Sequence, residues 1–323
     1  MKRIRLDLFL TAQYPQYSRS RIQQLIEEGY VSVDGVQKKA SHLLHGGEKI
    51  EMRRRAPVLP KAEPEAIPLT ILYEDDDLLI INKAVGMVVH PAPGHFGGTL
   101  VNAVLHHLGR EAIEEKEVRP GIVHRLDKGT SGVMVVAKND LAQRKLSNEW
   151  KARRVEKIYL ALVFGTFKVK EGKISLAIGR DTQHRRKFSS KTRKAREAIT
   201  YFKVQKTYSA GVTLLELRLE TGRTHQIRVH LSESGHPILG DTVYGAKTRL
   251  SSIKEAKLRE TIEAIDRPLL HALKLGFRHP GTGKEVHFEA PLPDDFQSMV
   301  EFLAKGPENS ISSLKKGGVV VSW

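Results

Sequence analysis

A polar loop at residues 121–132 carries the most reactive arrangement of side chains in the sequence. It reads GIVHRLDKGTSG, so a short apolar segment runs into a turn whose glycines allow sharp backbone bends. Asp127 stands between Arg125 and Lys128, and nearby cations favour the ionised form of a carboxylate. Such a carboxylate can act as a nucleophile or a base. Taken alone, the loop is at least as consistent with a surface turn that holds a modest ion pair.

A second polar segment, residues 221–230, offers cationic partners. It reads TGRTHQIRVH. We expect Arg223 to project from a loop before a helix, where its permanently charged guanidinium can pair with a carboxylate through two hydrogen bonds. The alternative is a basic helix that faces RNA without any catalytic part, and this remains open above all for Arg228 and His230.

Two further segments are candidates for supporting or completing a site. Residues 82–91, NKAVGMVVHP, read as a strand end followed by a loop with Gly86, and we expect them to support a site structurally. Residues 157–161, KIYLA, read as a strand on which Tyr159 could stack against a nucleic-acid base. Packing in the core is the simpler interpretation of Tyr159 from its local sequence.

Composition narrows the partners and the chemistry. Lysine and arginine number 53 against 37 acidic residues, which gives a net charge of +16 and a pI of about 9.8. A field of this sign attracts polyanions, so nucleic acid is the leading partner class. The absence of cysteine excludes disulfides, thiol nucleophiles and iron–sulfur or cysteine-based zinc sites.

Missing motifs exclude further classes. The sequence has no GxxxxGK[ST] phosphate loop, no GxGxxG that opens a helix and no HExxH. We therefore expect no cofactor and no metal site. The apolar run near the start is too short for a signal peptide, and no stretch approaches the ~20 apolar residues of a membrane span. We expect a cytoplasmic, soluble monomer with no membrane partner.

The chain is expected to fold as two domains. Residues 1–55 read as a small α/β module, in which Ser18 caps a helix and the Asp34-Gly35 pair makes a turn after a strand. Residues 56–68 are rich in proline and read as an exposed, semi-rigid linker.

Residues 69–303 read as the larger domain and residues 304–323 as a flexible tail. Strands and helices do not alternate regularly in the larger domain, so we expect an α+β fold with a largely antiparallel sheet. Thr224 is expected to cap a helix that begins at His225 and ends at Gly235. Strands are expected at residues 71–73, 78–82, 133–137, 158–163, 213–219 and 286–288, and helices at 99–108 and 140–151.

These segments together resemble a known family. Residues 124–132, HRLDKGTSG, are similar to the HRLDxxTSG signature of the RluA family of pseudouridine synthases. The segments NKAVGMVVHP, KIYLA, TGRTHQIRVH and HPILGDTVYG resemble its other motifs and follow in the family's order, although Ala84-Val85 replaces the more usual Pro-Ala or Pro-Pro. The resemblance spans residues 69–300. It implies conversion of uridine into pseudouridine in RNA, with base flipping and without a cofactor.

The resemblance also implies roles for individual residues. Asp127 is the implied catalytic carboxylate, because cleavage of a glycosidic bond builds positive character at C1′ that a carboxylate can stabilise or trap. Arg223 is implied to pair with Asp127, and Tyr159 to pack on the uracil and to be available as a base. The signature loop supplies three implied base-flipping residues, of which the arginine fills the vacated space: His124, Arg125 and Thr130.

The N-terminal module resembles an S4 RNA-binding domain through RLDLFL and SRSRIQQLIEEGYVSVDG. Its basic residues are expected to contact phosphates, namely Arg19, Arg21, Lys38 and Lys39. An S4 module ahead of such a catalytic domain implies 23S rRNA of the large ribosomal subunit as the partner, with the helix 69 stem-loop as the finer expectation. The competing interpretations are a non-catalytic RNA-binding assembly factor and a base-removing glycosylase.

Overall fold

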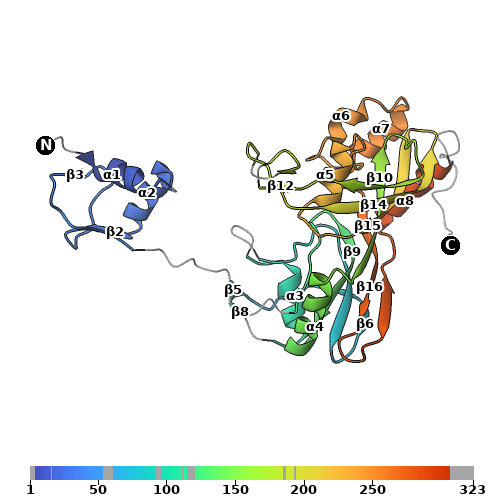
Figure 1. The fold of residues 1–323 in the computed structure, drawn as a ribbon, viewed down its shortest axis with the longest axis horizontal. Helices are drawn as coiled ribbons and strands as arrows, with labels where there is room; N and C mark the ends of the chain where they lie inside the picture. The colour runs from blue at the N-terminus through green and yellow to red at the C-terminus, as the bar shows by residue number, and fades with distance from the viewer. Residues whose placement is uncertain are drawn as a thin grey trace. The chain divides into compact units, whose positions relative to one another are not determined.

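A computed structural model describes residues 4–15, 17–53, 61–91, 96–110, 113–114, 121–184, 187–192 and 194–305. The chain divides into two compact units, residues 1–59 and residues 60–323 (Figure 1). Within the described ranges, no helix is long and apolar enough to cross a membrane.

The first unit is a small α/β module. Its elements are β1 (Ile4–Arg5), α1 (Leu6–Gln13), α2 (Arg19–Glu27), β2 (Val31–Val33), β3 (Leu43–Leu44) and β4 (Ile50–Met52). The expected helix cap is confirmed, because the Ser18 hydroxyl accepts a hydrogen bond from the Arg21 backbone N–H at 3.3 Å. After the turn at Asp34 only a single bridge joins Val33 to Val36. β2 pairs instead with β4, antiparallel and farther along the chain.

A buried carboxylate joins the two helices of this module. The Asp7 side chain is inaccessible to solvent and accepts hydrogen bonds from Arg5, Arg19 and Gln23. Burial raises the pKa of Asp7, but these hydrogen bonds outweigh it and leave the pKa well below its usual value. Arg19, expected to contact phosphates, therefore has a carboxylate partner within its own domain.

A mixed sheet forms the frame of the second unit. Among the described residues it has nine strands, in the order β11-β14-β15-β10-β16-β9-β7-β6, with β17 also paired to β16. All these pairings are antiparallel except the short one between β16 and β9, which confirms the predicted α+β class. The strands are β6 (Thr70–Glu74), β7 (Leu78–Lys83), β9 (Ser131–Ala137), β10 (Glu156–Phe164), β11 (Glu171–Ser175), β14 (Ile199–Tyr208), β15 (Val212–Leu219), β16 (Leu270–Arg278) and β17 (Glu285–Glu289).

Helices cover both faces of this sheet. Alternate residues of β7 point to opposite faces, so Leu79 and Ile81 pack on the side of α3 (Leu100–His107) while Leu78 and Ile80 pack on the side of α4 (Asp140–Lys151). The β10, β14 and β15 strands form a separate core with helices that follow them in the chain (Figure 1). These later helices are α5 (Gln226–Glu233), α6 (Ala246–Leu250), α7 (Ala256–Glu263) and α8 (Asp294–Lys305).

Strand β16 joins the two halves of the sheet. It pairs with β10 from its first residue to Gly276, but with β9 only at His271–Ser131 and Ala272–Gly132. Gly132 has a φ of 118° there, and a Cβ atom on it would lie 2.2 Å from the Ala272 carbonyl oxygen. Only glycine permits this close approach. The seam between the halves therefore depends on a residue of the signature loop.

The expected linker is shorter than its proline content suggests. Residues 61–62 form β5 (Lys61–Ala62), which pairs with β8 (Ile113–Glu114). The Asn102 side chain donates to the Glu63 carbonyl at 2.7 Å, which ties this segment to α3. Residues 54–60 and 306–323, which include the first five residues of the expected linker and nearly all of the expected tail, lie outside the described residues.

Candidate active site

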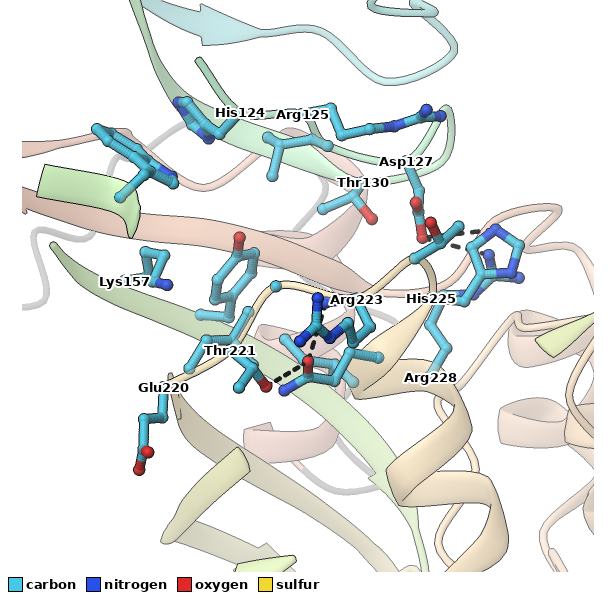
Figure 2. Close-up of a pocket in the computed structure, with 18 of the residues that line it drawn as sticks. His124, Arg125, Asp127, Thr130, Lys157, Glu220, Thr221, Arg223, His225 and Arg228 are labelled. Atoms are coloured by element: carbon cyan, nitrogen blue, oxygen red, sulfur yellow. Dashed lines mark hydrogen bonds and ion pairs between the residues drawn. The ribbon is translucent and has the colours of Figure 1, made fainter. Parts of the chain in front are cut away.

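A cavity of about 560 Å³ opens in the second unit, where the loop before β9, strand β10 and the loop between β15 and α5 meet (Figure 2). The sequence-predicted residues of the catalytic domain all line it: His124, Arg125, Asp127, Thr130, Tyr159 and Arg223. Segments far apart in the chain are thus brought to one place. The sheet explains this, since β9 and β10 both flank β16.

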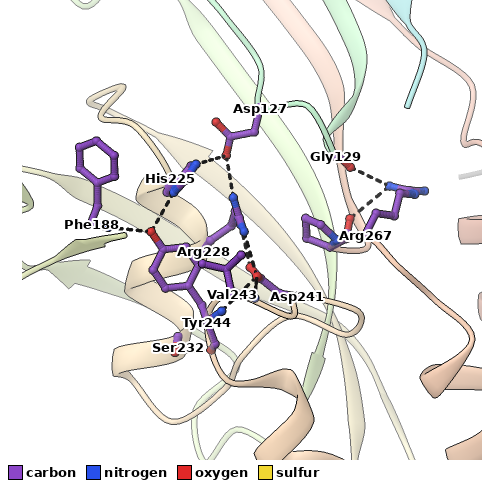
Figure 3. Close-up of polar contacts among 11 residues, drawn as sticks. Asp127, Gly129, Phe188, His225, Arg228, Ser232, Asp241, Val243, Tyr244 and Arg267 are labelled. Carbon is purple, nitrogen blue, oxygen red and sulfur yellow. Dashed lines mark hydrogen bonds and ion pairs between the residues drawn. The ribbon is translucent and has the colours of Figure 1, made fainter. Parts of the chain in front are cut away.

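The loop that carries Asp127 is fixed at its base. The Thr130 backbone N–H donates to the Asp127 carbonyl at 3.0 Å and closes the turn. Arg267, buried at 4% exposure, donates to the Gly129 carbonyl at 3.3 Å (Figure 3). It also pairs with Asp295 at 2.6 Å through its Nε. A guanidinium held by a carboxylate is a rigid donor, so the loop has little freedom to shift.

Arg228 is the cation that meets the Asp127 carboxylate. Its Nη1 lies 3.4 Å from Asp127 Oδ2. The same guanidinium forms a two-point ion pair with Asp241, with Nε–Oδ2 at 2.7 Å and Nη2–Oδ1 at 2.9 Å. Asp241 is 1% exposed and also accepts the Tyr244 backbone N–H at 3.2 Å. The arginine is therefore oriented before any substrate arrives.

The expected pairing of Arg223 with Asp127 is wrong. Arg223 lines the cavity, but its Nε donates to the Glu197 carbonyl at 3.0 Å. The reason is the start of α5. His225, the residue before α5, takes a left-handed backbone conformation with φ 57°. Arg223 therefore lies in the loop before this turn, and Arg228 lies in the first turn of the helix. The predicted Thr224 cap is also wrong, because His225 occupies the cap position without a side-chain hydrogen bond.

His225 is a second neighbour of the carboxylate, and the sequence reasoning gave it no role. Its Nε2 lies 3.8 Å from Asp127 Oδ2, the same oxygen that faces Arg228. Its Nδ1 lies 2.8 Å from the Tyr244 hydroxyl. Within the part of the chain that the structure describes, Asp127 Oδ1 has no hydrogen-bond partner and is the oxygen left for substrate. The signal was present in the motifs themselves, since His225 and Arg228 share one and Asp241 and Tyr244 share the other.

Tyr159 and Thr130 supply the cavity with hydroxyl groups. Burial, together with the charge of Asp127, raises the pKa of Tyr159 above its usual value, so the phenol stays protonated at neutral pH. Thr130 is 2% exposed, and its Oγ1 has no hydrogen-bond partner among the described residues. A buried hydroxyl without a partner is costly, which points to a ligand atom that completes it.

His124 has a supporting position in the wall. Its Nε2 accepts a hydrogen bond from the Val135 backbone N–H at 3.1 Å, and its ring stacks on Trp150 at 4.9 Å between centroids. Burial and the charge of Lys157 lower the pKa of His124 to about 3, so the ring is neutral. Because Nε2 is occupied by the backbone, this nitrogen is not available to RNA.

The mouth of the cavity is basic. Arg125 is exposed there, and Lys151, Arg153 and Lys157 line the same opening. Burial, with the charge of Arg153, lowers the pKa of Lys157. Arg153 is paired with Glu197 and with Glu220, which also lines the cavity. The excess of cations still suits a polyanionic substrate whose reacting centre develops positive charge.

Both units of the chain are similar to known protein families. The sequence model of the family described as RNA pseudouridylate synthase matches residues 77–233, and that of the S4 domain matches residues 4–50. A protein of Chlorobaculum parvum described as an RNA pseudouridine synthase is 44% identical over 306 residues, which cover 92% of this chain and 93% of the relative. The ribosomal large subunit pseudouridine synthase D of Vibrio parahaemolyticus is 41% identical and covers 94% of this chain and 92% of its own.

Relatives and solved structures extend the similarity beyond bacteria. The chloroplastic RNA pseudouridine synthase 2 of Arabidopsis thaliana is 39% identical over 94% of this chain and 81% of the relative. The structure of human RNA pseudouridylate synthase domain containing 4 superposes with a TM-score of 0.55 and 26% identity, covering 72% of this chain and 92% of that one. The human domain containing 1 protein gives a TM-score of 0.52 and 28% identity, with 75% and 97% covered.

Proposed function

Because this chain belongs to the RluA family of RNA pseudouridine synthases and carries an S4 domain, we propose that it isomerises specific uridines of 23S rRNA, with Asp127 as the catalytic carboxylate. The observation that carries the catalytic assignment is the Asp127–Arg228 contact inside a basic cavity. The choice of 23S rRNA is supported by the relatives described as ribosomal large subunit pseudouridine synthase D. Helix 69 of that RNA is the finer proposal.

The chemistry needs no other reactant. The N1–C1′ bond of uridine breaks, the uracil turns, a C5–C1′ bond forms, and the C5 proton is lost while N1 gains one. Positive character develops at C1′ in the first step, and Asp127 Oδ1 is free to stabilise or trap it. Direct attack on C1′ and a glycal route both use this carboxylate.

The remaining cavity residues hold the extruded nucleotide. Tyr159 packs on the uracil face as a neutral phenol, and the Thr130 hydroxyl completes its hydrogen bonding on the substrate. Arg125 occupies the space that the flipped base leaves in the RNA, since a planar guanidinium stacks well on bases. Arg223, whose guanidinium donates only through Nε among the described residues, contacts the RNA backbone at the wall of the cavity.

The test is cofactor-free turnover on two substrates. Purified protein is incubated with a 23S rRNA transcript and, separately, with large-subunit particles, and pseudouridine is mapped by carbodiimide adducts and primer-extension stops. We expect new stops that vanish with Asp127→Asn, while RNA affinity stays within about threefold of wild type. Stops in helix 69 support the finer proposal. Release of free uracil would instead indicate a glycosylase, and tight binding without stops on either substrate would indicate another RNA.

A further inference from the structure

Tyr244 lies at the centre of a chain of polar contacts that leads to the candidate catalytic carboxylate. The Phe188 backbone N–H donates to the Tyr244 hydroxyl oxygen at 2.9 Å. That hydroxyl lies 2.8 Å from His225 Nδ1, and His225 Nε2 lies 3.8 Å from Asp127 Oδ2 (Figure 3). The segments that carry Phe188, Tyr244 and His225 thus lie in a continuous series of contacts that leads to Asp127 Oδ2.

The donors and acceptors in this chain favour one tautomer of His225. The Tyr244 oxygen already accepts the Phe188 N–H, and its own hydrogen is free to point at His225 Nδ1. Burial raises the pKa of Tyr244 to about 12, which keeps this hydroxyl protonated. A neutral imidazole that accepts at Nδ1 carries its hydrogen at Nε2. That N–H then faces Asp127.

The surroundings of Tyr244 hold its hydroxyl in place. The ring is 8% exposed, and the Arg228 guanidinium lies over it at 4.9 Å from the ring centroid. The Ser232 hydroxyl donates to the Tyr244 carbonyl at 2.6 Å, and Asp241 accepts the Tyr244 backbone N–H. Tyr244 therefore contacts both residues that face Asp127 Oδ2, namely His225 and Arg228.

His225 itself adopts a backbone conformation that is uncommon outside glycine. Its φ is 57°, and its side chain makes no cap hydrogen bond to α5, so the side chain does not serve the helix. Phe188 packs on the ring edge-on at 5.4 Å between centroids and Tyr244 does so at 5.6 Å. Residues held in such conformations cluster at functional sites, where the surrounding structure determines them.

We infer that His225 and Tyr244 are positioning residues for Asp127: the Tyr244 hydroxyl holds His225 in the Nε2–H form, and this N–H donates to Asp127 Oδ2 when substrate fills the cavity. Catalytic hydrogen bonds are often long before substrate binds, and the 3.8 Å separation needs to shorten by under an ångström. With Arg228 and His225 both on Oδ2, the carboxylate presents Oδ1 to C1′. The inference rests on the proposed function, in which Asp127 is the catalytic carboxylate.

The first test compares substitutions at His225 in single-turnover assays on the RNA that the wild type modifies. His225→Gln keeps a donor near the Nε2 position, whereas His225→Asn tolerates the left-handed backbone but is too short to reach Asp127. We expect the rate constant to fall about tenfold to a hundredfold for Asn, and to recover at least fivefold in Gln relative to Asn. RNA affinity should stay within about threefold for both. His107→Gln is the matched control, because it removes an imidazole that pairs with Glu74 and does not line the cavity. It should leave the rate constant unchanged.

The second test uses Tyr244→Phe, which removes only the hydroxyl. We expect about a tenfold lower rate constant with unchanged RNA affinity. In protein labelled with ¹⁵N-histidine, the ring nitrogen signals of His225 are assigned by their loss in His225→Gln. In the wild type these signals should indicate the Nε2–H tautomer, and in Tyr244→Phe they should indicate a mixture of both tautomers. Tyr73→Phe, which removes a hydroxyl bonded to Asp75, should change neither.

The outcomes separate this inference from the proposed function. No pseudouridine from the wild type on either ribosomal substrate contradicts the proposed function. An active wild type with full rates in His225→Asn and Tyr244→Phe overturns the inference and leaves the function intact. Equal losses in His225→Gln and His225→Asn, or an Nδ1–H signature in the wild type, would also overturn it.

Discussion

Arg228 and Asp241 form a two-point ion pair, and the same guanidinium reaches the Asp127 carboxylate. The pair is almost inaccessible to solvent, with side-chain exposures of 8% and 1%. Two carboxylates thus share one arginine. The buried Asp241 sets the orientation of the Arg228 guanidinium, and this orientation places Nη1 against the more exposed Asp127.

Arg228→Lys should lower turnover about a hundredfold or more, because an ammonium cannot satisfy Asp241 at two points and reach Asp127 as well. RNA affinity should change little, since this side chain lies inside the cavity. Arg223→Lys is the matched substitution on the other side of His225, and we expect a loss of less than tenfold. Single-turnover rates at saturating enzyme decide between them. A larger loss at Arg223 would contradict the assignment of Arg228.

Asp241→Asn should destabilise the second unit by about 2–4 kcal/mol, because it leaves a buried guanidinium without its main counter-charge. Denaturant unfolding of the full chain, followed by hydrogen exchange in peptides of residues 226–245, measures this. Asp181→Asn, which removes a solvent-accessible carboxylate that accepts backbone N–H groups in a turn, should leave the free energy of unfolding nearly unchanged. If Asp241→Asn and Asp181→Asn changed the free energy of unfolding equally, the buried Arg228–Asp241 pair would not be contributing to stability.

Thr130→Val should move stability and activity in opposite directions. The free energy of unfolding should stay equal or rise by up to about 1 kcal/mol, since an unpaired buried hydroxyl is replaced by a methyl group of similar size. Turnover should fall about tenfold if the hydroxyl completes its hydrogen bonding on the substrate. Thr130→Ser keeps the hydroxyl and should retain most activity. Full activity in Val would remove Thr130 from the substrate contacts.

Lys83 gives a pH dependence with a defined sign. It is 1% exposed and donates to the Ala84 and Met87 carbonyls. Burial lowers its pKa to about 8 against an unfolded value of 10.5, with Asp127 opposing this and Arg267 adding to it. Between these pH values the unfolded chain holds a proton that the folded chain has released, so folding stability rises with pH.

The measurement is the free energy of unfolding of the wild type minus that of Lys83→Met, from pH 7 to pH 11. We expect this difference to stay level below pH 8 and to rise by roughly 2–3 kcal/mol up to pH 10.5. The subtraction cancels other titrating groups that the two proteins share. A flat difference across the range would mean that the folded-state pKa of Lys83 is not lowered.

The S4 module should contribute to RNA affinity through charge. Changing Lys38 and Lys39 together to Gln should weaken binding and reduce the slope of log Kd against log salt by about two. Arg19 is unsuitable for this test, because its guanidinium also holds the buried Asp7. Lys168 and Lys170, exposed in the second unit, provide a paired control. An unchanged slope would exclude Lys38 and Lys39 from the phosphate contacts.

Elements defined by local patterns could be predicted from the sequence. The helix expected at residues 140–151 forms with these bounds, because its apolar residues recur at helical spacing and Asn139 caps it. β14 was not predicted, since Ile199–Tyr208 mixes lysines with aromatic residues and becomes a strand only through its pairing with β11 and β15. The order of strands likewise depends on contacts between distant segments.

The candidate site divides in the same way. The loop of Asp127 and the position of Tyr159 follow from motifs, and both line the cavity. The choice between Arg223 and Arg228 depended on where one helix begins, and a left-handed residue at His225 settles it in favour of the later arginine. The motif that contains Tyr244 marks this residue as a candidate, but its contact with His225 required tertiary structure, because nothing in its own segment indicates that it meets a histidine 19 residues earlier in the chain.

The short seam between β9 and β16 makes the active centre bipartite. The carboxylate is supplied by the chain before residue 152, on the side of β9, while Tyr159 and Arg228 come from the chain after it, on the side of β10. Neither portion contains a complete set of reacting groups. The contact between Asp127 and Arg228 therefore depends on the short pairing that joins the two halves at Gly132 and Ala272. Substitutions along this seam can alter the reaction rate without touching any residue that faces RNA.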